Sequence, residues 1–381
     1  MKLKIAILGT RGIPNHYGGF EQITAYISRG LADAGHEVTV YNSHNHPYQD
    51  DTWHGVRIVH CFDPEYLIHT AGQFIYDLNC ILHARKQRFD VVIFMGYTSS
   101  SIWARLFPKH SIIISNMDGL EWKRTKYSKP IQKFLKWAEK KAVDESDFHI
   151  ADSVAIQEYL NKKYALKSKF IPYGASLHKM DRPEIMTRYN LASHEYYLLM
   201  ARMEPEKNID MILQGYSASN SDKKFIIIGN TVNGYGKKMM RKYGKDNRIT
   251  FIGPLFDQDS VHTLRSNSLL YFHGHSVGGT NPSLLEAMAS KSRIAAHDNV
   301  FNKAILEEDA FYFKDCTDIK NLIESDSIMI QGARMASNNF QKVIDNYSWQ
   351  KIIDEYEFFI CNCYKKMNNE ETVQYKRYVY Q

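Results

Sequence analysis

Short apolar runs alternate with amphipathic stretches along the first half of the chain. Phe20, Ile23, Ile27 and Leu31 recur at helical spacing, and Gly35 is placed to end that helix. Apolar runs typical of buried strands occupy residues 4–8, 37–41, 56–60, 91–95, 111–115, 148–151 and 169–172. Because strands that alternate with helices form parallel sheets covered on both faces, this half predicts a doubly wound, Rossmann-like α/β domain.

The same pattern restarts in the second half. Further strands are expected at residues 196–200, 225–229, 249–253, 269–272 and 292–296, with helices at 210–216 and 259–266. Residues 174–195 show no strand pattern and contain Pro183, so we interpret them as the link between two domains, residues 1–175 and 176–349. Doubly wound sheets bind ligands at the carboxyl ends of their strands. Two such domains therefore predict a substrate site in a cleft between them.

Composition narrows the class of protein only a little. Of the 381 residues 44% are hydrophobic, which is enough for two cores, and the formal charge is +6. A charge this small is compatible with phosphate-bearing ligands or an anionic membrane surface and establishes neither. We expect no nucleic-acid partner.

The cysteines and the apolar runs bear on the compartment. The five cysteines have no CxxC spacing and are odd in number, which argues against a disulfide framework or a zinc site. The apolar run near the N-terminus is too short for a signal-peptide core, and no run approaches the roughly 20 residues of a membrane span. We expect a cytoplasmic protein whose membrane contact, if any, is peripheral at the inner face of the plasma membrane.

A glycine-rich loop follows the first strand and precedes the first helix. It contains Gly12, Gly18 and Gly19, whose small size lets a ligand approach the backbone, and Arg11, expected as an exposed ligand for phosphate or sugar. The G-x-G-x-x-G fingerprint of dehydrogenases is absent. The alternative is a purely structural turn.

A second candidate follows the first strand of the second half. Arg202 at the strand end and Lys207 near the next helix are two cations suited to a diphosphate leaving group. The alternative is a pair of solvated cations bridged to Glu204 or Glu206.

A third candidate is the start of a helix after the strand at 269–272. Asn281 is placed to cap it, and the free N–H groups of Ser283 and Leu284 are expected to face a phosphate. Glu286, one turn in, could accept both ribose hydroxyls. The expected donor-binding residues are Gly279, Thr280, Asn281, Ser283, Leu284 and Glu286. The alternative is an ordinary capped helix.

Two histidines precede that helix. His273 and His275 are expected on opposite faces of a strand, and no carboxylate partner is evident for either. A metal site is therefore not expected.

The loop after the strand at 111–115 holds a further candidate. Asp118 and Glu121 lie beside Trp122, which could stack on a sugar, while the carboxylates could accept hydroxyl hydrogen bonds. The alternative is a capping Asp and a core Trp.

A basic helix is expected at residues 130–143. Ile131, Phe134, Leu135, Ala138 and Ala142 are expected on one face, with Lys133, Lys136, Lys140, Lys141 and Trp137 largely opposite. A tryptophan among lysines suits an anionic membrane surface, and the alternative is a solvated helix face.

Taken together, these motifs resemble the retaining glycosyltransferases of family 4, which have the GT-B fold. Arg202 and Lys207 look like the R-x4-K clamp of that family, and Glu286 looks like the second Glu of its E-x7-E motif. Gly18 and Gly19 match its N-terminal glycine pair. The helical stretch at 348–364 looks like the one that crosses back, so residues from about 350 to 381 are expected to pack on the first domain.

A narrower resemblance is to bacterial rhamnosyltransferases that build capsule or cell-wall polysaccharide. It rests on the strings GTRGIPNHYGGFE, MDGLEWKR, HSVGGTNPSLLEA and AHDNVFN. Two positions depart from the wider family: Gly278 stands where the first Glu of E-x7-E should be, and Asp118 stands where many members have His. The role of that Glu is therefore not carried over.

The resemblance implies transfer with retention from a UDP- or dTDP-linked sugar to a saccharide, with no metal or other cofactor, and the narrower resemblance implies rhamnose as that sugar. Arg202 and Lys207 would stabilise the leaving diphosphate and Glu286 would hold the ribose, while the glycine loop and Asp118 would face the sugar and the acceptor. The basic helix favours a lipid-linked acceptor such as a polyprenyl-diphosphate saccharide. The alternatives are a nucleotide-sugar epimerase of the same fold and a non-catalytic protein that binds sugar nucleotides.

Overall fold

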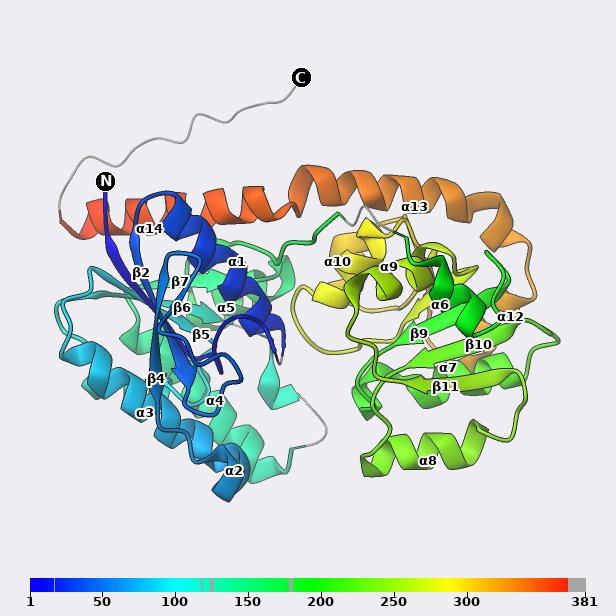
Figure 1. Cartoon of the computed structure of the whole chain (residues 1–381), viewed down its shortest axis with the longest axis horizontal. Helices are drawn as coiled ribbons and strands as arrows, with labels where there is room; N and C mark the ends of the chain where they lie inside the picture. The colour runs from blue at the N-terminus through cyan, green and yellow to red at the C-terminus, as the bar shows by residue number, and fades with distance from the viewer. Residues whose placement is uncertain (17, 118, 124–126, 178–180, 369–381) are drawn as a thin grey trace. The chain divides into compact units, whose positions relative to one another are not determined.

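The chain forms two compact units in the computed structural model, which describes all residues except 17, 118, 124–126, 178–180 and 369–381 (Figure 1). Unit 1 consists of Met1–Trp122, Lys126–Pro172 and Trp349–Gln381, and unit 2 consists of Lys123–Thr125 and Tyr173–Ser348.

Unit 1 is built on an eight-stranded sheet in the order β3-β4-β2-β1-β5-β6-β7-β8. Its strands are β1 (Lys4–Leu8), β2 (Glu37–Ser43), β3 (Thr52–Trp53), β4 (Val56–Cys61), β5 (Val91–Met95), β6 (Ile112–Met117), β7 (Phe148–Ala151) and β8 (Lys169–Phe170). The pairings are parallel apart from the antiparallel β3–β4 pair. The chain order reverses between β1 and β5, so the carboxyl ends of these strands border a crevice where doubly wound folds bind ligands.

Helices cover both faces of this sheet (Figure 1). They are α1 (Gly19–Asp33), α2 (Glu65–Ile68), α3 (Gly72–Arg85), α4 (Lys129–Glu145), α5 (Val154–Tyr164) and α14 (Trp349–Met367), with short 3-10 turns at η1 (His69–Ala71), η2 (Ser101–Leu106) and η3 (Glu121–Lys123). In unit 1, α1 and α14 lie on one side of the sheet, and α2, α3 and α4 lie on the other.

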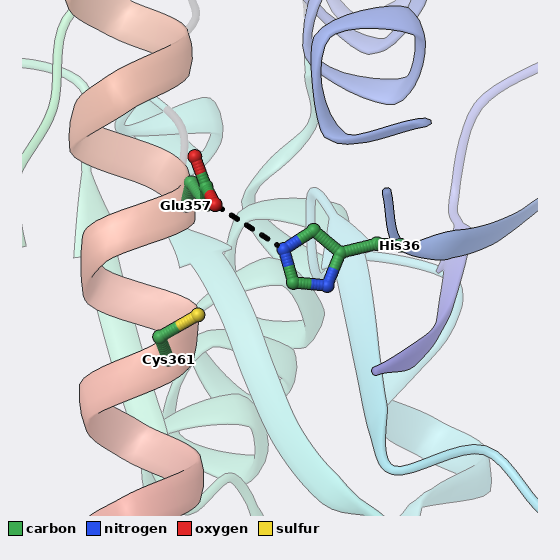
Figure 2. A group of neighbouring side chains, drawn as sticks. All are labelled: His36, Glu357 and Cys361. Atoms are coloured by element: carbon green, nitrogen blue, oxygen red, sulfur yellow. Dashed lines mark hydrogen bonds and ion pairs between the residues drawn. The ribbon is translucent and has the colours of Figure 1, made fainter. Parts of the chain in front are cut away.

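The last helix, α14, packs on unit 1 through aromatic and polar contacts. The rings of Tyr26 and Trp349 stack at 3.9 Å, and the side-chain amide of Asn116 donates to the buried hydroxyl of Tyr356 at 3.0 Å. A third contact joins the buried His36 ring to Glu357 at 3.4 Å (Figure 2). These contacts join residues more than 200 positions apart, so the first strand-helix pairs and the end of the chain form one unit.

Unit 2 has a six-stranded parallel sheet in the order β11-β10-β9-β12-β13-β14. Its strands are β9 (Tyr196–Met200), β10 (Lys224–Ile228), β11 (Ile249–Gly253), β12 (Leu270–His273), β13 (Ile294–His297) and β14 (Phe311–Phe313). Its helices are α6 (Pro183–Arg188), α7 (Ile209–Ser217), α8 (Gly234–Tyr243), α9 (Gln258–Ser266), α10 (Pro282–Ala289), α11 (Val300–Leu306), α12 (Cys316–Ile323) and α13 (Ser327–Asn346), with a 3-10 turn at η4 (Pro205–Lys207). The chain order reverses between β9 and β12.

Both sheets follow the predicted alternation of strands and helices. Five of the predicted strands have the observed limits, namely 4–8, 91–95, 148–151, 196–200 and 249–253, and the others differ by one or two residues at an end. The very short β3 and β14 were not predicted, since neither is long enough to show alternation. The predicted doubly wound α/β fold is confirmed.

Candidate functional site

In unit 2, the loops that follow β9 and β12 meet at the point where the strand order reverses. The backbone N–H and the hydroxyl of Ser276 both donate to the Glu206 carbonyl, at 3.1 and 3.0 Å. The Asn208 amide donates to the Gly274 carbonyl at 2.8 Å, and a Cβ on Gly274 would lie only 2.0 Å from the Lys207 carbonyl. Glycine is therefore required where the two loops touch.

This junction places Lys207 against the histidine pair. Lys207 is buried, and its ammonium contacts Nε2 of His275. The His273 and His275 rings stack at 4.6 Å and 7°. The prediction that they occupy opposite faces is wrong, because residues two positions apart in an extended chain point to the same side.

His273 itself lies deep in the unit. Burial, together with the nearby Lys207 and Arg265, lowers the pKa of His273 to about 3, so its ring is neutral at physiological pH. Its Nε2 is buried and has no hydrogen-bond partner among the described residues. Because the His273 ring is neutral, it adds no positive charge beside Lys207 and Arg265.

A buried arginine holds Glu286 in place. Arg265 on α9 donates from Nη1 to the Glu286 carboxylate at 2.8 Å and from Nη2 to the Ser283 hydroxyl at 3.0 Å. The Tyr271 hydroxyl also lies 3.0 Å from the Ser283 hydroxyl. Sequence reasoning missed Arg265, because it lies in the last turn of an amphipathic helix, 21 residues before its partner, and shows no local signal.

The start of α10 differs from the prediction in one respect. Asn281 does cap the helix and Pro282 is its first residue, as expected. The Ser283 N–H, however, donates to the Asn281 side chain at 3.0 Å, and the Leu284 N–H donates to the Asn281 carbonyl at 3.0 Å. The prediction that these two N–H groups are free for a phosphate is therefore wrong, since the cap already uses both.

Arg202 follows β9, and a loop that contains Gly278 and Gly279 precedes α10. The Arg202 side chain is 65% exposed and lies 3.8 Å from the Glu204 carboxylate. Gly279 and Asn281 line a small hollow with Gly278, while Thr280 is buried. Position 278 is a glycine and therefore carries no acidic group. Its φ is +140°, and no atom lies within 4 Å of the place where a Cβ would be.

The glycine-rich loop of unit 1 is shaped by contacts within the fold. Gly12 has φ +127°, and a Cβ there would lie 2.3 Å from the Asn42 side chain, which exchanges two hydrogen bonds with the Ile13 backbone. Gly18 precedes α1, and Gly19 is its first residue. At Gly12, therefore, the structure itself explains the glycine.

Arg11 is partly buried and held by a carboxylate, not presented as an exposed guanidinium. Its Nε and Nη2 donate to the two carboxylate oxygens of Glu65 at 2.9 and 2.8 Å, and its backbone N–H donates to Glu21 at 3.0 Å. The expectation of an exposed guanidinium is wrong, because Glu65 lies 54 residues further along the chain and only the fold brings it close.

Arg11 and Glu65 border a cavity of about 270 Å³ at the carboxyl ends of β1, β2 and β4. Its lining residues are Arg11, His16, Glu21, Ser43, Asn45, His46, Pro47, Asp63, Glu65 and Tyr66. A volume near 300 Å³ is at the lower end of the range of small-molecule sites.

The candidates that follow β6 are only partly described. Asp118 lies outside the described residues. Glu121 opens the turn η3, and the Trp122 indole donates to the buried Glu139 carboxylate at 3.1 Å with the Lys136 ammonium 4.2 Å from its ring centroid. Trp122 is thus tied to α4.

Helix α4 buries part of its predicted apolar face. Leu135, Ala138 and Ala142 are buried as expected, whereas Ile131 and Phe134 are exposed beside Trp137. The Phe134 ring lies 5.7 Å from the Trp137 ring and 5.8 Å from that of Phe74 on α3. Only part of the predicted apolar face of α4 is therefore buried.

His36, Glu357 and Cys361 place potential metal-ligand atoms within 4.8 Å of one another (Figure 2). The Leu3 N–H donates to His36 Nδ1 at 3.2 Å, so Nδ1 carries the lone pair and Nε2 carries the proton that points to Glu357. Burial raises the pKa of the Cys361 thiol, which keeps it protonated. The group is better explained as a hydrogen-bonded contact between α14 and the sheet than as a set of metal ligands.

Comparison with family models assigns the two halves separately. Residues 2–176 match a domain of unknown function (DUF1972), and residues 181–335 match the glycosyl transferases group 1. The match to the glycosyl transferases group 1 thus lies within the second half of the chain. No curated protein sequence matches the chain significantly.

Solved structures show the same fold across nearly the whole chain. Sucrose-phosphate synthase from Thermosynechococcus elongatus is similar with a TM-score of 0.78 and 16% identity, over 96% of this chain and 99% of that one. HepE from Anabaena, solved with UDP-glucose, gives a TM-score of 0.73 at 15% identity over 95% and 99%. A glycosyltransferase from Rickettsia africae gives 0.70 at 13% identity over 97% and 100%. Together with the group 1 domain, these similarities support a glycosyltransferase of the GT-B fold.

In the described residues no helix is both long and apolar enough to cross a membrane.

Proposed function

We propose that the protein transfers a sugar, with retention of configuration, from a nucleoside diphosphate donor to a saccharide acceptor. The observation that carries the proposal is the group in unit 2 that joins Lys207, His275, His273, Arg265 and Glu286 at the carboxyl ends of β9 and β12. It lies in a domain that matches glycosyl transferases group 1, and HepE has been solved with UDP-glucose.

The chemistry required is stabilisation of a leaving diphosphate. In our proposal the Lys207 ammonium, held against His275 in a buried position, meets the phosphate nearest the sugar, and the exposed Arg202 closes over it. Preorganised positive charge in a site of low dielectric lowers the barrier for departure of an anion. The leaving phosphate then takes the proton of the acceptor hydroxyl, so no separate protein base is needed.

Glu286 is proposed to accept the ribose hydroxyls. Its carboxylate is 19% exposed and is anchored by Arg265, so it presents its remaining acceptor capacity in a fixed direction. The base of the donor is proposed to be uracil or thymine. The four long motifs, which resemble those of bacterial rhamnosyltransferases, favour rhamnose as the transferred sugar.

The clamp is tested with Arg202→Ala and Lys207→Ala, singly and together. We expect each single variant to lower kcat by about 10²-fold or more, because each removes a positive charge that stabilises the leaving diphosphate in the transition state. Arg188→Ala, a cation of the same unit on α6, is the control and should leave the rate unchanged. Unchanged transfer in the double variant would contradict the proposal.

Two alternatives give different results in the same assay. A nucleotide-sugar epimerase would convert free donor with no acceptor present. A protein that only binds sugar nucleotides would be stabilised by donor in thermal-shift experiments, as RT ln(1 + [L]/Kd) requires, but would show no turnover with any acceptor.

We further propose that the acceptor is lipid-linked, for example by polyprenyl diphosphate, and that α4 meets the membrane surface. Ile131, Phe134 and Trp137 are exposed on this helix next to Lys133. Apolar and aromatic side chains beside lysines suit the interface of an anionic bilayer.

Cosedimentation with vesicles tests the membrane proposal. The wild-type protein should bind vesicles rich in phosphatidylglycerol at low salt, and Phe134→Ala with Trp137→Ala should weaken binding about tenfold or more. Phe256→Ala removes an 83% exposed aromatic of unit 2 and is the matched control. Equal binding by all three proteins, or none by the wild type, would refute the role of α4.

A further inference from the structure

The cavity of unit 1 is rich in hydrogen-bond acceptors and poor in positive charge. Three of its lining side chains are carboxylates, from Glu21, Asp63 and Glu65, and one is a guanidinium, from Arg11. Counting only the carboxylates and the guanidinium, one positive charge against three negative ones gives a formal charge of −2.

The single guanidinium does not offset this field. Arg11 donates bidentately to Glu65, and such a fork-to-fork pair uses the geometry by which arginine would grip a phosphate or a carboxylate. An anionic ligand would have to displace Glu65 and leave that partly buried carboxylate without its partner.

His46 does not supply a positive charge. The Tyr48 N–H donates to its Nδ1 at 3.1 Å, and its Nε2 lies 3.2 Å from the Pro14 carbonyl, to which it donates. Both ring nitrogens are thereby satisfied by a neutral imidazole, and burial lowers the pKa of His46 more than these backbone contacts raise it.

The other two carboxylates are built into the walls. Glu21 and Asp63 are both buried, and each accepts a backbone N–H, from Arg11 at 3.0 Å and from Glu65 at 2.9 Å. An ionised carboxylate has about four acceptor positions, so a single N–H leaves capacity for hydroxyl donors. At the rim, the exposed Tyr66 offers an aromatic face of the kind on which sugar rings pack.

We propose that this cavity binds one sugar ring of the acceptor, and that this ring carries no anionic group. The inference rests on the proposed glycosyltransferase function and specifies the class of acceptor. Hydroxyl groups of a neutral or amino sugar donate to the carboxylates, whereas a uronic acid or a sugar phosphate is repelled. Any diphosphate of a lipid-linked acceptor consequently lies outside this cavity.

The test uses saturation-transfer NMR on the full-length chain with two panels of probes. The neutral panel holds methyl glycosides of glucose, galactose, N-acetylglucosamine and rhamnose, and the anionic panel holds glucuronate, galacturonate and glucose 6-phosphate. We expect at least one neutral glycoside to bind and no anionic sugar to bind.

Variants then locate the binding. Asp63→Asn keeps a side-chain oxygen that can accept the Glu65 N–H, so the backbone between these residues keeps its hydrogen bond. The substitution removes the negative charge and should weaken binding of the neutral glycoside about tenfold. Asp33→Asn, the same change at an exposed position of α1, should have no effect. Binding of an anionic sugar that persists when Arg202 and Lys207 are both replaced by Ala, absence of all neutral-glycoside binding, or an unaltered Asp63→Asn affinity would each overturn the proposal.

Donor binding provides the independent check on the proposed function. Thermal shift with UDP-, dTDP- and GDP-sugars reports on the residues of unit 2, which Asp63→Asn leaves unchanged. If no sugar nucleotide binds, the glycosyltransferase proposal fails. If a donor binds but the cavity prefers anionic sugars, only the acceptor assignment fails.

Discussion

Replacing Arg265 with Met should destabilise unit 2 strongly. The Arg265 side chain is 3% exposed and makes hydrogen bonds to Glu286 and Ser283, so its removal leaves the Glu286 carboxylate without its cation in a mostly buried position. Methionine fills much of the space of the arginine stem, which keeps the packing loss small. Breaking one side of a buried ion pair costs about 3–5 kcal/mol, and we expect a value in that range.

A double variant separates the charge from the packing. Arg265→Met with Glu286→Gln removes both charges, so it should recover a large part of the loss, with a coupling energy of about 1–3 kcal/mol. The Glu286→Gln single variant should lie between the wild type and Arg265→Met, because the amide oxygen can still accept from the guanidinium.

Urea denaturation provides the assay, and tryptophan fluorescence shows which of the two units unfolds. All five tryptophans, at positions 53, 103, 122, 137 and 349, belong to unit 1, so their fluorescence reports on that unit while far-UV circular dichroism reports on both. At an m-value of about 2–3 kcal/mol/M, the predicted loss of about 3–5 kcal/mol lowers the midpoint seen by circular dichroism by about 1–2.5 M. A loss below about 1 kcal/mol, or a double variant as unstable as the sum of the singles, would refute the reasoning.

Two further predictions concern unit 1. Burial raises the pKa of Asp77 to about 7, above its value in the unfolded chain, so the stability that the protonated carboxyl contributes is full below about pH 4 and is lost as the pH rises through 7. Asp77→Asn should therefore reduce the fall in unfolding free energy between pH 4 and 7, by up to about 4 kcal/mol. Asp33→Asn, the control, should leave this fall unchanged. If urea titrations gave the same pH profile for Asp77→Asn and the wild type, the assignment would be contradicted. Gly12→Ala should cost about 2–4 kcal/mol, because a Cβ would meet Asn42 at 2.3 Å and φ is +127°. Gly35→Ala, at φ +94° with no atom within 4 Å, should cost only about 1 kcal/mol in thermal or urea unfolding, and a similar cost for both would show that the clash with Asn42 does not matter.

Local patterns in the sequence determined the longer strands, several of the helices (α1, α4, α7, α9, α10 and α14) and the cap of α10. A run such as 196–200 shows its own apolar period, and an Asn-Pro pair before an apolar stretch specifies a helix start within three residues. Since both depend only on neighbours in the chain, they could be predicted together with the doubly wound fold and the loops at the strand ends.

The partners of the charged side chains were decided by the tertiary structure alone. Arg11 meets Glu65, Arg265 meets Glu286 and His36 meets Glu357, across separations of 54, 21 and 321 residues. Which apolar residues of α4 are exposed likewise depends on how the helix packs on the rest of unit 1. Pairings of this kind leave no periodic signal, because they arise only when strands distant in sequence become neighbours in a sheet, and they decide which polar groups remain to meet a ligand.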